Sequence, residues 1–140
     1  MAEGIGAARP ATASGVSQAA WLDAAAARSF AHCGDFAAAW LREGWGVPAD
    51  GRADLTLKGW ARVLHAAGGL EAVAETEAAA LGLKAASAPA AGQVALAPVP
   101  ASNGRTRLAC AVIAPSLRCA VWSDSGLLLI SAAPRRTWEV

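Results

Sequence analysis

The residue best suited to do chemistry in this chain is Cys33. The residues that follow it at the spacing of one helical face are Phe36, Ala37, Trp40 and Leu41, so the cysteine is predicted to open a buried helix. A thiol at a helix N-terminus lies near the positive end of the helix dipole, which favours the thiolate, and cysteine hydrolases place a nucleophile there. The alternative is a small apolar side chain in the core, because free cysteine is among the most buried residue types. Spacing alone favours the second interpretation.

Three other residues could act as an acid or base beside this thiol. His32 precedes Cys33 directly, and adjacent side chains on a helix diverge by about 100°, so the two are not expected to face each other. We interpret His65 as a surface residue of a later helix, with a relocated base as the alternative. We interpret Asp35 as a first-turn acid that interacts with the helix dipole, with a catalytic carboxylate as the alternative. A general base for Cys33 is therefore unidentified.

The remaining cysteines, Cys110 and Cys119, fall in predicted strands and are expected in the core. An odd count of three cysteines without a C-x-x-C pair indicates neither a disulfide framework nor a zinc site. We therefore expect no metal, no cofactor and synthesis in a reducing cytoplasm.

The totals exclude several classes of function. A chain of 140 residues is long enough for one domain with a substantial core. The formal net charge is +1, and the lysines and arginines are not clustered in the sequence, so we expect no basic surface that binds nucleic acid. The N-terminus lacks the pattern of a signal peptide, and no apolar run approaches the roughly 20 residues that span a bilayer, so no membrane insertion is expected.

The elements that must position Cys33 are predicted in two halves of a single domain, residues 17–140. The helical half, 17–83, contains predicted helices over 17–29, from 33 to Gly44 or Gly46, over 56–67 and over 70–81. A linker rich in Ala, Ser and Pro follows at 84–91. Residues 92–140 form the sheet half, with predicted strands at 93–97, 107–114, 117–123 and 127–132. Residues 108–113 are apolar on both faces and should be central, and 123–126 should form a hairpin turn.

Residues 1–16 are rich in Ala, Gly, Ser and Thr and carry almost no large apolar side chain. Such a segment cannot build a core, and it is predicted to be a flexible arm. The alternatives are a disordered tail and an arm that orders against a neighbouring subunit.

A series of short motifs over about residues 20–140 resembles, in the same order, a small family of phage and prophage proteins encoded among tail genes. The matching stretches are Phe30-Ala31-His32-Cys33-Gly34-Asp35-Phe36-Ala37-Ala38, Gly68-Gly69-Leu70-Glu71-Ala72, Leu81-Gly82-Leu83, Gly92-Gln93-Val94, Ser125-Gly126-Leu127-Leu128 and Thr137-Trp138-Glu139-Val140. That family is similar to papain-like, NlpC-type cell-wall peptidases. The resemblance implies an α+β, papain-like NlpC-type fold, with N-terminal helices packed on a C-terminal antiparallel sheet of about four strands or more.

The resemblance also implies a nucleophile at Cys33, but two departures argue against an active enzyme. The acidic residue that precedes the cysteine in the family is His32 here. Active peptidases of this type carry a histidine at the start of the strand that corresponds to residues 107–113, and this stretch contains none. Without a base the thiol stays mostly protonated near neutral pH, and no group protonates a leaving amine. The inherited catalytic pair is predicted to be degenerate.

The tryptophans divide into two groups. Trp21, Trp40 and Trp60 lie on apolar helical faces and are expected in the core. Trp45 and Trp138 lie in less regular context, and tryptophan is favoured at protein interfaces. We therefore expect one of these two to contact a partner.

These observations lead to one expected function and two alternatives. The expectation is a structural component of the tail tip or baseplate of a phage or phage-like particle, made in the bacterial cytoplasm and located in the virion tail, where it contacts hub or distal tail subunits. The first alternative is an active cysteine peptidase or amidase that cleaves peptidoglycan peptides during genome entry. The second is an assembly factor that is absent from the finished particle.

Overall fold

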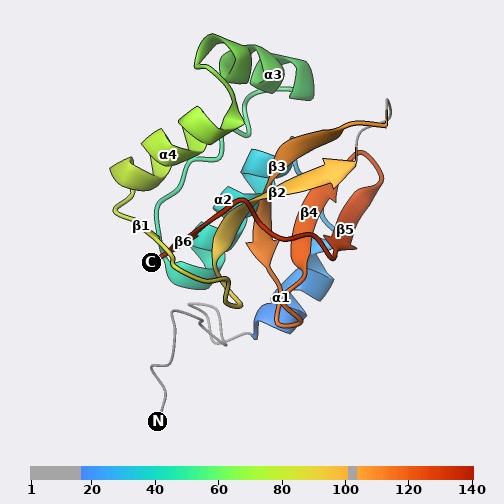
Figure 1. Cartoon of the computed structure of the whole chain (residues 1–140). Coiled ribbons are helices and arrows are strands. Elements are labelled where there is room, and N and C mark those ends of the chain that lie inside the picture. Colours follow the sequence, from blue (N-terminus) through green and yellow to red (C-terminus); the bar gives the residue numbers. More distant parts are fainter. Residues whose placement is uncertain (1–16, 101–103) are drawn as a thin grey trace.

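The computed structural model describes residues 17–100 and 104–140, and the predicted arm at 1–16 lies outside this range. The elements are α1 (Gln18–Ala25), α2 (Cys33–Trp45), α3 (Leu57–Ala66), α4 (Leu70–Ala80), β1 (Lys84–Ala85), β2 (Val94–Pro100), β3 (Thr106–Ile113), β4 (Cys119–Ser123), β5 (Gly126–Ile130) and β6 (Arg136–Glu139). Helices precede strands along the chain, as Figure 1 shows in colour. The predicted α+β class is confirmed.

The described strands form one antiparallel sheet in the order β1-β6-β2-β3-β4-β5. β3 lies between β2 and β4, which confirms the central position predicted from its apolar faces. Ser123 pairs with Gly126 across a tight turn, and its hydroxyl donates to the Gly126 carbonyl at 2.9 Å, which confirms the predicted hairpin.

The helix α2 lies against the sheet and is the best-buried helix (Figure 1). Phe36, Ala39 and Trp40 are completely inaccessible to solvent. The indole nitrogens of Trp40 and Trp45 each donate to the carbonyl of Gly92, at 2.8 Å in both cases, so a polar contact fixes the helix against the start of β2. Gly46, at φ +71°, ends the helix in the left-handed conformation that glycine adopts without strain.

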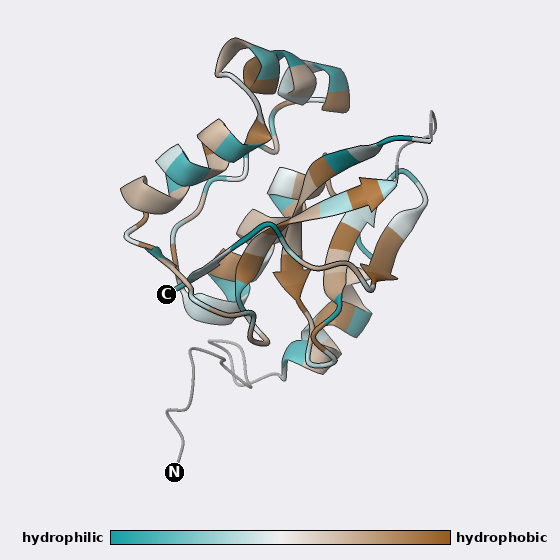
Figure 2. Ribbon diagram, viewed as in Figure 1, coloured by the Kyte–Doolittle hydropathy of each residue, from teal (hydrophilic) through white to brown (hydrophobic). Residues whose placement is uncertain are grey.

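The second face of the sheet carries its own apolar cluster, formed by Ala95, Ala97, Val99, Ala109, Ala111, Ile113, Cys119 and Val121. The segment 131–135 between β5 and β6 crosses this region in Figure 1. The Cys119 thiol donates to the Ala132 carbonyl at 3.6 Å, and the Arg135 amide donates to the Leu96 carbonyl at 2.8 Å, so this segment is fastened to the sheet. Figure 2 shows the apolar character of the central strands, which lie between α2 on one face and the segment 131–135 on the other.

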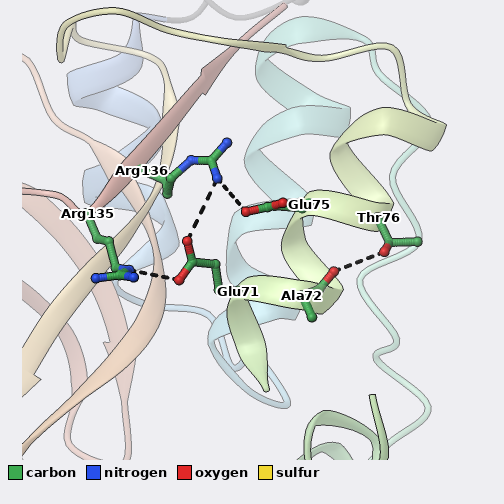
Figure 3. A network of polar contacts seen from close by, with 6 residues as sticks. All are labelled: Glu71, Ala72, Glu75, Thr76, Arg135 and Arg136. Atoms are coloured by element: carbon green, nitrogen blue, oxygen red, sulfur yellow. Dashed lines mark hydrogen bonds and ion pairs between the residues drawn. The ribbon is translucent and has the colours of Figure 1, made fainter. Parts of the chain in front are cut away.

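The helices α3 and α4 lie toward one end of the sheet (Figure 1), and ion pairs fasten α4 to it. Arg135 binds Glu71 at 2.8 Å, and Arg136 reaches both Glu71, at 3.8 Å, and Glu75 (Figure 3). The four charges join α4 to the beginning of β6. Between 30 % and 59 % of each side chain is exposed to water, so these ion pairs contribute little to the stability of the fold and mainly fix the position of α4.

Four predictions about the elements need correction. The first helix ends at Ala25, not Ser29, because the chain turns there and brings Arg28 onto Glu43 and over the Phe30 ring. In α3 only Trp60 of the predicted apolar face is buried, since this helix lies at the edge of the molecule. Two strands were not predicted: β1 lies in the predicted linker, and β6 is formed by the last residues of the chain.

The strand β2 extends beyond its predicted end, through two prolines, to Pro100. After Leu96 it is paired with β3 alone, so the N–H groups that the prolines lack are not needed for pairing on the other side.

A glycine in α2 tests how tightly this helix is packed. A Cβ at Gly44 would lie 2.5 Å from the Trp40 ring, which is buried and held by its indole hydrogen bond. We expect Gly44→Ala to lower the free energy of unfolding by about 1–3 kcal/mol, although alanine normally favours a helix.

The matched control is Gly59→Ala in α3, where the nearest atom to a new Cβ is 3.5 Å away. This change should be neutral or stabilise the protein by up to about 1 kcal/mol. Denaturant unfolding of both variants measures the difference, and equal effects would contradict the packing described for α2.

Candidate functional site

Two hydrogen bonds at the N-terminus of α2 engage the side chains of His32 and Asp35. His32 is the N-cap residue, and its Nδ1 accepts from the Asp35 amide at 3.2 Å. The Asp35 carboxylate in turn accepts from the Ala31 amide at 2.9 Å. The arrangement differs from a capping box in that the aspartate accepts from the amide one residue before the cap and not from the cap residue itself. The sequence interpretation of Asp35 as a first-turn acid agrees with this position.

The other side of the His32 ring is also engaged. Its Nε2 lies 2.9 Å from the Arg52 carbonyl, which can only accept, so the hydrogen is on Nε2. The ring stacks on Trp60 with centroids 4.3 Å apart and an angle of 5° between the planes. With both nitrogens bonded to the main chain and 3 % of the residue exposed, His32 is a structural residue.

The thiol of Cys33 faces β3. Its sulfur accepts a hydrogen bond from the Cys110 amide at 3.3 Å, across 77 positions of sequence. Both cysteines are half-buried. Cys110 therefore occupies the place on the central strand that lies opposite the candidate nucleophile, and the expectation of a plain core residue missed this role.

The two thiols have opposite electrostatic environments. A hydrogen bond from the Cys110 side chain is the main cause that lowers the pKa of Cys33 from 9.0 to about 7, with help from the Cys110 amide and the Arg107 charge and against the effect of burial. The pKa of Cys110 is raised well above 9.0 by the same contact with Cys33, by burial and by the charge of Glu77. One thiol thus ionises near neutral pH while its neighbour stays protonated.

Cys33 lines a cleft of about 540 Å³ between the α1–α2 connection, α3 and the strands β2 to β5. Its walls are mainly apolar and aromatic, and they include Phe30, Trp60, Trp122, Leu128 and Ile130. Arg107 and Asp124 supply one charge of each sign. The exposed side chains of Leu57 and Leu128 lie at this cleft as well, which suits an apolar or amphipathic ligand.

The other sequence candidates lie away from the Cys33 sulfur. His65 is exposed on α3 and does not line the cleft, as expected for a surface residue. Cys119 is fully buried in the second cluster, as predicted. Trp138 is 6 % exposed and carries the Arg136 guanidinium over its ring, and Trp45 is half-buried. A partner contact by either tryptophan stays a prediction, and Trp45 has more surface to offer.

The described part of the chain holds no group of three or more His, Cys, Asp or Glu side chains that could hold a metal ion. Nor does any helix within 17–100 and 104–140 have the length and apolarity needed to span a bilayer. Comparisons with models of protein families, with curated proteins and with solved structures find no match to this chain. The chemistry of the cleft is therefore the basis on which a function is proposed.

The pH dependence of alkylation tests the cause of the lowered pKa. In a Cys119→Ser background, the alkylation rate of Cys33 should rise with the thiolate fraction and reach half its plateau near pH 7. Cys110→Ala removes the main stabilising hydrogen bond, so the midpoint should move upward toward 9.0.

Arg107→Gln serves as the graded comparison, because its charge contributes less and the midpoint should rise by a smaller amount. If the midpoint does not change in Cys110→Ala, the Cys110 thiol is not the cause of the lowered pKa of Cys33.

Proposed function

We propose that the protein is a structural component of the tail tip or baseplate of a phage or phage-like particle, built on a degenerate cysteine-peptidase scaffold. Its cleft binds a segment of a neighbouring tail subunit and performs no hydrolysis. Two kinds of observation support this proposal. One is the resemblance of the motifs, in their order, to the phage tail-gene family, and the other is the geometry around Cys33.

The positions of the two histidine side chains are the main support for the proposal that catalysis is lost. The chain has two histidines. His32 uses both ring nitrogens to cap α2 and to bind the Arg52 carbonyl, and His65 lies outside the cleft. A cysteine peptidase needs a base that can also protonate the leaving amine, and such groups contribute about 10²–10⁴-fold to the rate. Cys110 lies opposite the sulfur instead, and because its pKa is raised well above 9.0, its thiol keeps its proton near neutral pH and cannot accept one from Cys33.

The layout of the described elements supports the choice of scaffold. A cysteine opens a helix that packs on an antiparallel sheet, and its sulfur touches the strand that follows the Gly92-Gln93-Val94 stretch. That arrangement is expected of a papain-like, NlpC-type fold. A cleft with aromatic walls and little charge suits a peptide segment whose apolar side chains it buries.

An active peptidase or amidase that cuts peptidoglycan peptides is the second candidate. One observation favours it, namely a thiol with a pKa of about 7 at a helix N-terminus and on the wall of a large cleft. It needs a base from outside the chain or from the substrate.

Incubation with purified peptidoglycan separates the two candidates. We expect no release of peptide fragments that depends on Cys33, so the wild type and Cys33→Ala should give the same background by mass spectrometry. Cys119→Ala is the matched control for a lost thiol away from the cleft. Release by the wild type and by Cys119→Ala, but not by Cys33→Ala, would establish the peptidase.

Analysis of purified particles tests the location in the tail. The protein should be detected in finished particles by mass spectrometry, and Cys33→Ala should assemble normally. Removal of residues 1–16 should impair assembly, because the segment is too poor in apolar residues to serve an isolated domain. Finished particles without the protein would point to an assembly factor.

A further inference from the structure

The contact between Cys33 and Cys110 places two thiols within bonding reach. The Cys110 amide lies 3.3 Å from the Cys33 sulfur, and the N–Cα bond adds only about 1.5 Å. The Cys33 sulfur therefore lies at most about 4.8 Å from the Cys110 Cα, so the Cys110 side chain begins close enough to the Cys33 sulfur for a disulfide. The side chain of each cysteine is also the first cause of the shift in the other's pKa, as expected of neighbouring thiols.

The two sulfurs also differ in access. Cys33 lines the open cleft of about 540 Å³. Cys110 lines a separate apolar gap of about 80 Å³ between α2, α4 and the sheet. The first thiol can meet a molecule that enters the larger cleft, while the second lines a gap that is much smaller. An accessible thiol that ionises easily, paired with a protonated and less accessible one, is the arrangement of a thiol–disulfide exchange site.

We propose that Cys33 and Cys110 form a redox site that exchanges with a small-molecule disulfide, with Cys33 as the attacking thiol and Cys110 as the resolving thiol. The Cys33 thiolate attacks one sulfur of the external disulfide, forms a mixed disulfide and releases one thiolate. Cys110 loses its proton to solvent and attacks the Cys33 sulfur, which forms the Cys33–Cys110 bond and releases the second thiolate. The protein is oxidised by two electrons, and the external disulfide is reduced to two thiols.

The bond would change the protein as well as the small molecule. It joins the first residue of α2 to the central strand across 77 positions of sequence, and so it restrains the unfolded chain. It also removes the free thiol from the cleft. The oxidised protein should therefore unfold at a higher temperature, while the proposed binding role needs no free thiol.

Treatment of the full chain with oxidised glutathione tests the proposal. In the Cys119→Ser background, we expect a product that has lost two hydrogen atoms, carries no glutathione and yields a peptide cross-linked through Cys33 and Cys110. Its melting temperature should rise by several degrees and return on reduction. Cys110→Ser in the same background should instead stop at the mixed disulfide on Cys33.

A stable glutathione adduct on Cys33 in the protein that retains Cys110 would overturn the proposal, because it would mean that Cys110 does not resolve the mixed disulfide. Absence of any reaction at Cys33 in the folded protein would overturn it too. Cys33→Ser should form neither product, and a circular dichroism spectrum equal to that of the parent shows that the variant is folded. These readouts are independent of tail assembly and of peptide release, so the two proposals fail separately.

Discussion

The packing of α2 against β3 is the interaction on which the other features of this protein depend. The Trp40 and Phe36 side chains of this helix are completely buried, and the hydrogen bonds of Trp40 and Trp45 to Gly92 fix its position against the start of β2. Because the helix is held at this point, its first residue reaches the central strand and the Cys33 sulfur meets the Cys110 amide. Placement of the thiol is thus a consequence of core packing, and a shift of the helix would separate the two cysteines.

The cap of this helix decides what the thiol can do. His32 supplies the capping acceptor and stacks on Trp60, which ties α3 to the start of α2. An imidazole used in this way is unavailable as a base, and the thiol ionises through its contacts with Cys110 and Arg107 instead. An easily ionised thiol without a base can still exchange with disulfides, which need only a nucleophile and a resolving partner. The contacts that engage His32 therefore leave the proposed redox chemistry possible.

Local patterns predicted much of the fold. The spacing after Cys33 and the glycine at position 46 set both ends of α2, and the two apolar faces of residues 108–113 placed β3 at the centre of the sheet. β6 was missed because its residues become a strand only by pairing with β1 and β2, which are distant in sequence. Cys110 was recognised as a strand residue, yet its contact with Cys33 depends on where α2 rests along β3. Alternation in the strand places Leu108, Cys110 and Val112 on one face, and no local signal says which of them meets the thiol. The capping role of His32 was missed because histidine is an uncommon N-cap residue.

We infer that Cys110, and not an imidazolium, stabilises the Cys33 thiolate. Nitrogen NMR of the imidazole rings near neutral pH, where Cys33 is partly ionised, measures this most directly. Because Nδ1 accepts from the Asp35 amide and Nε2 donates to the Arg52 carbonyl, we expect a neutral His32 ring with hydrogen on Nε2 alone, and signals that do not change in Cys33→Ala. A His32 ring protonated on both nitrogens in the wild type, and neutral once Cys33 is removed, would reveal a thiolate–imidazolium pair and would mean that Cys110 is not what stabilises the thiolate.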